Sequence, residues 1–161
     1  MKTSQLYIRR GELKDLPLIK QCLIDSWVEH ARHEPALLDE ERMRNSQVEE
    51  YYESALTNSK NIILVAESQG KFAGFVRANK EEIPSFFKNS KTLFIDDICV
   101  LPEYRKHGVG RNLLQEIEKL AKGENIRRLQ CRVYTFNVPS QRLFQSMGYS
   151  MPHSIWDKSL E

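Results

Sequence analysis

The apolar positions of this chain recur in two spacings, one typical of helices and one typical of strands. Apolar residues at every third or fourth position mark the amphipathic helices. Such helices are expected over residues 15–33, 46–58, 111–122 and 139–147. Ser46, followed by Glu49 three positions later, is the expected N-cap of the second of them. The charged segment 35–45 is expected to be a loop or a short helical turn.

Between these helices lie short runs of apolar and β-branched residues that predict strands. Two of the runs flank the dipeptide Gln69-Gly70, which is a hairpin signal. The strands are expected over residues 6–11, 61–68, 71–79, 92–101 and 127–135, with a strand-like tail over 148–160.

The order of these elements predicts the fold class. Residues 92–134 form a strand–helix–strand unit, which normally pairs its strands in parallel through a right-handed crossover. The earlier hairpin is antiparallel. We therefore expect an α/β fold with a mixed, mostly antiparallel sheet and helices on both faces. The length of 161 residues suits a single domain over residues 1–161.

Composition limits the partners that this protein is expected to have. Twenty-four Lys and Arg against 22 Asp and Glu leave a net charge of +2, so neither nucleic acid nor a membrane is an expected partner. No run approaches the ~20 apolar residues that span a bilayer. Three cysteines without CxxC spacing are typical of a reducing, cytoplasmic location. His30 and His33 have metal-ligand spacing but no third ligand, so a solvated helix end is expected there, and no metal.

The segment RKHGVG, residues 105–110, stands at the junction of a predicted strand and a predicted helix. A helix N-terminus has unpaired N–H groups and a partial positive charge, and glycines allow a ligand to approach the backbone closely. This combination favours a phosphate site, to which Arg105 and Lys106 add charge-assisted contacts. A tight helix entry with a solvated basic turn is the alternative. The spacing fits neither a Walker A loop nor a dinucleotide fingerprint.

Two segments together resemble the GNAT N-acetyltransferase superfamily. Residues 100–114 read V-x-P-E-Y-R-x-x-G-x-G-x-x-L-L, which is similar to its acetyl-CoA-binding motif. Residues 137–149, NVPSQRLFQSMGY, resemble its N-x-x-A-x-x-x-Y-x-x-x-G-F segment. The resemblance implies an enzyme that moves an acetyl group from acetyl-CoA, as co-substrate, to a primary amine by direct attack on the thioester. Such proteins often form homodimers, which is a further expectation.

The resemblance also implies where acetyl-CoA binds. Asn137 would contact the pantetheine arm, and Phe144 would lie near the thiol. The arm would pair with backbone near Ile98 and Val100, and a free N–H around Val100 would stabilise the developing charge on the carbonyl oxygen. The pyrophosphate would bind the backbone amides of a continuous segment, which comprises His107, Gly108, Val109, Gly110 and Arg111.

Asp96 and Asp97 are adjacent acids in an otherwise apolar strand and are the candidate catalytic residues. Strand alternation predicts that they point to opposite faces, so that at most one faces a given cleft. The run IDDICV resembles I-E-D-x-x-V in diamine acetyltransferases, which implies Asp96 as the base, acting directly or through water. Asp97 would then help to hold a cationic acceptor. The structural alternative is one acid that pairs with a loop and one that faces solvent.

Phe144 stands where the family usually has a tyrosine that protonates the leaving thiolate. A thiol pKa near ~8.5 makes the thiolate a tolerable leaving group without this donor, and Tyr134 or a water could replace it. The expected acceptor is a small cationic amine, polyamine-like or amino-acid-like, with a protein amine as an alternative. Phe144 favours a second hypothesis, in which the protein is an acetyl-CoA-binding sensor or scaffold with weakened or lost acetyl-transfer activity. Trp156 is expected in the core or at a subunit contact.

Overall fold

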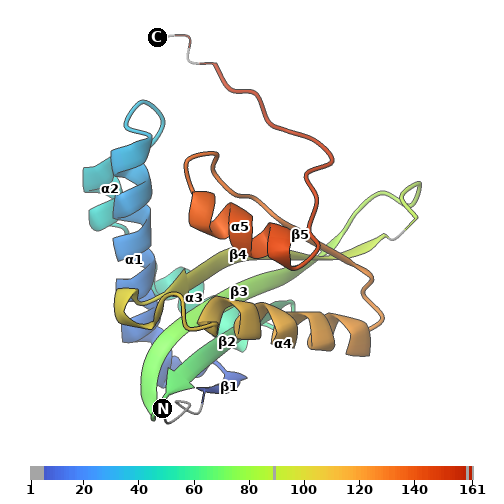
Figure 1. The fold of residues 1–161 in the computed structure, drawn as a ribbon, viewed down its shortest axis with the longest axis horizontal. Helices are drawn as coiled ribbons and strands as arrows, with labels where there is room; N and C mark the ends of the chain where they lie inside the picture. Colours follow the sequence, from blue (N-terminus) through green and yellow to red (C-terminus); the bar gives the residue numbers. More distant parts are fainter. Residues whose placement is uncertain (1–5, 89, 159, 161) are drawn as a thin grey trace.

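A five-stranded mixed sheet forms the centre of the computed structural model, which describes residues 6–88, 90–158 and 160 (Figure 1). Its strands follow one another in space in chain order. The first four pair in antiparallel fashion, and the last two pair in parallel, which confirms the predicted mixed sheet. The strands are β1 (Leu6–Arg10), β2 (Asn61–Ser68), β3 (Lys71–Glu82), β4 (Lys91–Val100) and β5 (Arg128–Cys131).

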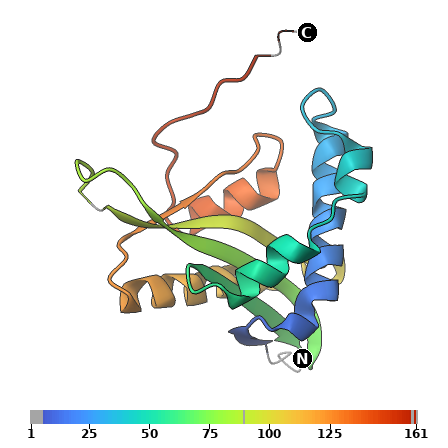
Figure 2. The ribbon, with the colours of Figure 1, turned by 180° about the vertical axis from the view of Figure 1, so that it is seen from behind.

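Helices cover both faces of this sheet, as the sequence predicts (Figures 1 and 2). One face packs on α1 and α3, and the other packs on α4 and α5. The short α2 lies against α1. The helices are α1 (Leu16–His33), α2 (Glu40–Arg44), α3 (Glu49–Thr57), α4 (Val109–Gly123) and α5 (Val138–Ser146).

The side-chain alternation of β2 explains why both faces need a cover. Ile62 and Leu64 point into the core that α4 and α5 cover, whereas Ile63 and Val65 point into the core under α1 and α3. All four side chains are buried, so neither face of this strand could be left in water without a large loss of apolar burial.

Two local predictions are wrong. The N-cap of α3 is Val48 and not Ser46, whose hydroxyl instead donates to the Arg42 carbonyl at 2.8 Å. The described residues of the tail 148–160 form no strand, and Trp156 is 93% exposed, so it is not in this chain's core. The tail extends away from the rest of the molecule in Figure 1, which leaves it without a strand to pair with.

Candidate active site

A β-bulge brings the two candidate acids together. The pairing of β3 with β4 matches Arg77 with Asp97 and then Ala78 with Ile95, so Asp96 is an extra residue in β4. The extra residue changes the alternation, because Ile95 and Ile98 both pack toward the core under α4 and α5. The prediction that Asp96 and Asp97 lie on opposite faces is therefore wrong, since strict alternation fails at a bulge.

Both carboxylates meet the guanidinium of Arg77, a side chain on β3 that sequence reasoning did not single out. Arg77 Nη2 lies 2.8 Å from Asp96 Oδ2, and its Nε lies 3.4 Å from Asp97 Oδ2. The Arg77 residue is only 4% exposed, so its charge is largely screened from water. Two tyrosines of α3 complete its surroundings: the guanidinium donates to the hydroxyl of Tyr51 and lies 4.7 Å from the Tyr51 ring centre and 5.6 Å from that of Tyr52.

The two acids differ in their other contacts. Asp96 Oδ2 accepts a hydrogen bond from Asn79 Nδ2 at 2.6 Å, and Asp97 Oδ2 accepts one from the Tyr52 hydroxyl at 2.6 Å. Burial raises the pKa of Asp97, although the Tyr52 hydrogen bond and the charge of Arg77 act in the opposite direction. Asp97 is therefore a carboxylate that takes up a proton more readily than an ordinary aspartate.

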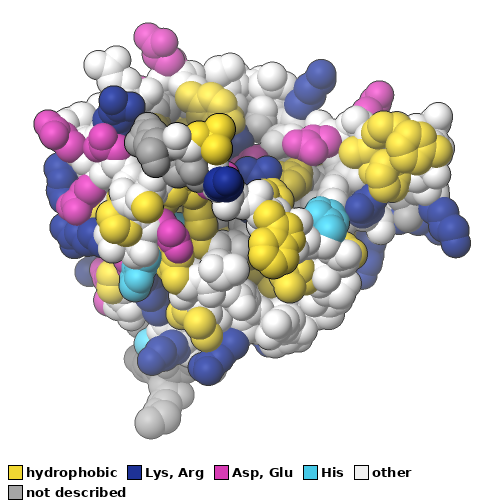
Figure 3. All heavy atoms as spheres, turned by 90° about the horizontal axis from the view of Figure 1, so that it is seen from above, with side chains coloured by type: hydrophobic (Ala, Val, Ile, Leu, Met, Phe, Trp, Pro, Cys, Tyr) yellow, Lys and Arg dark blue, Asp and Glu magenta, His cyan; other side chains and the backbone are white. Residues whose placement is uncertain are grey.

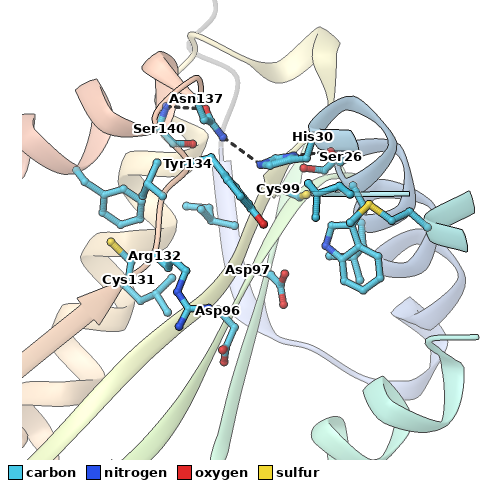
Figure 4. A pocket seen from close by; sticks show the side chains of 18 residues that line it. Ser26, His30, Asp96, Asp97, Cys99, Cys131, Arg132, Tyr134, Asn137 and Ser140 are labelled. Atoms are coloured by element: carbon cyan, nitrogen blue, oxygen red, sulfur yellow. Dashed lines mark hydrogen bonds between the residues drawn. The ribbon is translucent and has the colours of Figure 1, made fainter. Parts of the chain in front are cut away.

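A cavity of about 190 Å³ lies directly over this acid pair (Figure 4). Its walls come from α1, from the segment between α1 and the end of α2, from β4, from the chain after β5 and from α5. Figure 4 shows Asp96 and Asp97 at its floor and Tyr134 pointing into it from the segment after β5. The cavity thus combines apolar walls with a few polar groups, as small-molecule sites do.

His30 and Asn137 close the upper end of the cavity. His30 Nδ1 lies 2.6 Å from the Ser26 carbonyl, which can only accept, so Nδ1 carries the proton. Its Nε2 lies 3.5 Å from Asn137 Nδ2, and Asn137 Oδ1 accepts from the Ser140 N–H at the start of α5. The sequence interpretation of His30 as a solvated helix end is wrong, because helical spacing alone does not show what packs against a helix.

β4 and β5 part from one another beside the acid pair. Their ladder ends at the pair Ile95 and Cys131, although β4 continues to Val100. The Leu101 N–H donates to the Ala73 carbonyl on β3, whereas the Val100 carbonyl points the other way and accepts from Arg105 Nε at 3.0 Å. Because the N–H and C=O of one strand residue point to the same side, the Val100 N–H faces the gap that β5 leaves.

The glycine-rich segment forms a tight turn into α4. Lys106 and Gly108 both have positive φ values, 63° and 82°, and only glycine adopts such values without strain. The Asn112 N–H makes a hydrogen bond to the Gly108 carbonyl, so the N–H groups of residues 109–111 precede the first bond of the helix. His107 is exposed in this turn, and Val109 is buried beneath it.

Gly110 and Arg111 have packing roles in this turn. A Cβ on Gly110 would lie 3.1 Å from Leu143 Cδ2, so this glycine allows α4 and α5 to approach closely. Arg111 donates from Nη2 to the Ser146 hydroxyl at 2.8 Å and so connects the same two helices. The glycine spacing of the motif therefore serves helix packing at one position and backbone conformation at another.

A family model described as the acetyltransferase (GNAT) family matches residues 24–149 of this chain. The chain belongs to the GNAT acetyltransferase family. An uncharacterized N-acetyltransferase from Archaeoglobus fulgidus is 27% identical over 147 residues, which cover 91% of this chain and 95% of that relative. The sequence prediction of an acetyl-CoA-dependent N-acetyltransferase is thereby confirmed at the level of family and enzyme class.

Solved structures share the GNAT fold of this chain. A mutant of the BH1408 protein from Bacillus halodurans superposes with a TM-score of 0.88 at 18% identity, over 96% of this chain and 99% of that one. The aminoglycoside N-acetyltransferase AAC(6')-Iy, solved in complex with CoA, has a TM-score of 0.74 at 19% identity, over 98% and 96% of the two chains. The fold is therefore one that has been observed with CoA bound.

This GNAT chain keeps Phe144 in its core, where the family usually has a tyrosine. The Phe144 residue is 5% exposed and borders the cavity. Its ring packs edge to face against the Tyr149 ring, with 5.0 Å between the ring centres. The ring cannot donate a proton. Tyr134, in the segment after β5, carries a hydroxyl on the cavity wall instead.

The described residues contain neither a cluster of metal ligands nor a membrane-spanning helix. Within that part of the chain, no three His, Cys, Asp or Glu side chains are grouped as metal ligands would be. No helix in the described ranges is both long and apolar enough to cross a membrane.

Proposed function

We propose that this GNAT protein transfers the acetyl group of acetyl-CoA to a primary amine of a small molecule. The observation that carries the proposal is the gap between β4 and β5. Gly110, at the start of α4, lies beside this part of β4, since a Cβ there would be 3.8 Å from Ile98 and 3.9 Å from Val100, and the cavity over the acid pair adjoins the same strand. An extended ligand with an anionic end and a reactive end fits such a gap.

The residues of the gap fit the parts of acetyl-CoA, which supplies an acetyl group activated as a thioester. The unpaired amides of the turn and of the first residues of α4, His107 through Arg111, would bind the pyrophosphate. Arg105 and Lys106 add positive charge there, although Arg105 also holds the Val100 carbonyl. The pantetheine arm and the thiol would lie against the backbone at Ile98 and Val100 and against the side chains of Asn137 and Phe144.

Acetyl transfer forms a C–N bond, breaks the C–S bond and moves one proton off the amine. The Val100 N–H faces the gap and would donate to the carbonyl oxygen as negative charge develops on it. A carboxylate of the acid pair would accept the proton of the amine, directly or through water. The Tyr134 hydroxyl, or a water, would protonate the leaving sulfur in place of the tyrosine that Phe144 replaces.

The contacts of the two acids favour Asp97 as the proton acceptor, whereas the family resemblance favours Asp96. Arg77 Nη2 and Asn79 hold Asp96 within 2.8 Å, so its Oδ2 atom is already engaged by two protein groups. Asp97 lies further from the Arg77 guanidinium, and burial raises its pKa toward the range of an effective base. Substitution of each acid by asparagine separates the two assignments, because the true base loses the more activity.

Other expectations stay predictions. A protein amine as acceptor, a homodimer and a cytoplasmic location are consistent with the sequence. Phe144 favours a weak enzyme or an acetyl-CoA sensor over a fast enzyme, and the rate of the purified protein decides between them. Micromolar affinity for acetyl-CoA with turnover indistinguishable from the uncatalysed reaction on every amine tried would support the sensor.

The cofactor site is tested by titrating the protein with acetyl-CoA in a calorimeter. Gly108→Glu places a carboxylate and a strained residue in the turn, so binding should be lost. Gly123→Glu is the matched control, since a Cβ there meets no atom within 4 Å and the position lies at the other end of the same helix. Equal affinity in wild type and Gly108→Glu would contradict the proposed pyrophosphate site.

A further inference from the structure

The charges around the cavity balance, which bears on the acceptor. Asp96 and Asp97 are negative, but the buried Arg77 contacts both of them. Arg132, in the segment directly after β5, is a second cation on the cavity wall. Within the described residues it forms no ion pair shorter than 4.0 Å, so its charge is available to a ligand.

Two of the acidic residues near α2 are already paired with arginines. Asp39 caps α2 through the Arg42 N–H at 2.9 Å and lies 3.4 Å from the Arg42 side chain. Glu40 lies 2.9 Å from Arg32 and 2.7 Å from Arg44. Figure 3 shows acidic and basic side chains interspersed on this side of the molecule. For a polycation, Asp39 and Glu40 are therefore already compensated.

The wall opposite β5 is apolar. Leu23 and Trp27 of α1 line the cavity together with Leu38 and Met43, which come from the segment between α1 and the end of α2. Leu38 and Met43 are half-buried, so their side chains have surface left to cover. An apolar group of the acceptor would gain free energy by covering that surface.

We propose that the acceptor is an amino-acid-like amine with a free carboxylate and an apolar side chain. The carboxylate binds Arg132, the amine faces Asp96 and Asp97, and the apolar side chain packs on Leu38 and Met43. Arginine suits a carboxylate because its planar guanidinium donates two parallel hydrogen bonds. Figure 4 shows Arg132 and Asp96 together in the lower part of the cavity, as adjacent amine and carboxylate groups require.

This inference rests on the proposed function and names its substrate class. The products are the N-acetylated acid and free coenzyme A: an amide C–N bond forms, the thioester C–S bond breaks, and the amine proton leaves through the acid pair. The acceptor keeps its own carboxylate throughout, so the charge on Arg132 is needed in both substrate and product complexes.

The test compares amines that differ only in the carboxylate. Thiol release is measured with saturating acetyl-CoA and with leucine, methionine or phenylalanine against the corresponding amines that lack the carboxylate, with spermidine and glycine alongside. We expect kcat/KM to be about 10- to 100-fold higher for each amino acid than for its decarboxylated partner, the range of a charge-assisted pair. We also expect kcat/KM to be higher for leucine than for glycine, because glycine has no side chain to cover the apolar wall.

Two variants assign these preferences to residues. Arg132→Gln should reduce the preference for the carboxylate to about one, whereas Arg127→Gln, an exposed arginine just before β5, should leave the preference unchanged. Leu38→Ser should reduce the preference for leucine over glycine. A preference for the carboxylate that survives in Arg132→Gln would overturn the role of Arg132.

Failure of the inference and failure of the proposed function give different results. Turnover of spermidine or of the decarboxylated amines at rates equal to or above those of the amino acids would overturn the inference and leave the acetyltransferase function standing. Turnover of no amine, in a protein that binds acetyl-CoA in the calorimeter, would overturn both.

Discussion

Arg77 on β3 lies 2.8 Å from Asp96 and 3.4 Å from Asp97 on β4, so one buried cation serves two neighbouring acids. The bulge at Asp96 makes this arrangement, because it lets consecutive residues of a strand contact the same guanidinium. The charge of Arg77 also lowers the pKa of Asp97, against the larger effect of burial.

Arg77→Gln is expected to leave two acids close together without a cation. Breaking a largely buried ion pair by removing one partner should lower the free energy of unfolding by about 3 kcal/mol. In the protein that still folds, the acidic limb of the kcat/KM profile should move to higher pH, because Asp97 loses the nearby positive charge that lowers its pKa. Arg77→Lys, which keeps the charge, should restore part of both properties. An unmoved profile in folded Arg77→Gln would count against this role.

Asp97→Asn is expected to change stability in a pH-dependent way. Burial raises the folded-state pKa of Asp97 above its ordinary value of 3.8, so the folded state binds this proton more tightly than the unfolded chain does. The stabilisation that this tighter proton binding gives the folded state is fully present below pH 3.8. It is lost as the pH rises through the folded-state pKa of Asp97. The Tm of Asp97→Asn relative to wild type should therefore increase from about pH 4 to about pH 8, as thermal melts would show.

Activity should fall in the same variant. Loss of a positioned base typically lowers kcat/KM by about 10²–10⁴-fold. The loss should be largest at low pH, because at high pH a growing share of the amine is already unprotonated. Asp96→Asn is the comparison: a greater loss there than in Asp97→Asn would assign the base to Asp96.

Tyr134→Phe tests whether the cavity has a substitute proton donor. We expect it to lower kcat by about 10²-fold, which is the lower end of the range for a positioned acid. Phe144→Tyr should restore part of the rate in the double variant, because it returns a hydroxyl to the family's usual position. Steady-state thiol release is measured for wild type, Tyr134→Phe and the double variant. Full activity of Tyr134→Phe would mean that water protonates the sulfur.

Asp15→Asn is expected to destabilise the protein far from the cavity. Arg9 donates to both Asp15 oxygens, at 2.7 and 2.8 Å, and Asp15 is 4% exposed. Burial alone would raise the pKa of Asp15, but the hydrogen bonds from Arg9 and from the Glu12 backbone outweigh it and lower the pKa below 3.8. The pair of Arg9 and Asp15 thus stabilises the fold above pH 3.8. This stabilisation is lost as the pH falls through the lowered folded-state pKa of Asp15.

Urea unfolding measures this effect. Asp15→Asn should lose about 2 kcal/mol at neutral pH, and the difference from wild type should shrink in acid. Asp25→Asn, an exposed acid on α1, is the control and should stay within about 0.5 kcal/mol of wild type. A difference for Asp15→Asn that is constant from neutral pH into acid would argue against the linkage.

The helices and strands were largely predictable because their apolar spacing is local. The runs that became β2 and β4 are long and apolar, and the amphipathic segment of α4 buries Leu113 and Ile117 where the pattern places them. The tail was predicted wrongly, because a strand needs a partner and the residues around Trp156 contain no information about one. The N-cap prediction was wrong because α3 begins after Val48, and the Ser46 hydroxyl donates to the Arg42 carbonyl.

The sequence by itself determined the fold class, the glycine turn into α4 and the identity of the acids, since each follows from neighbouring residues or from a motif of continuous chain. Only the tertiary structure decided that Asp96 and Asp97 share Arg77 and that His30 and Arg132 both line the cavity. These residues come from several elements, and the bulge that brings Asp96 and Asp97 to one guanidinium arises from the register between β3 and β4. Register and helix packing are set by many long-range contacts at once, which no local pattern of residues records.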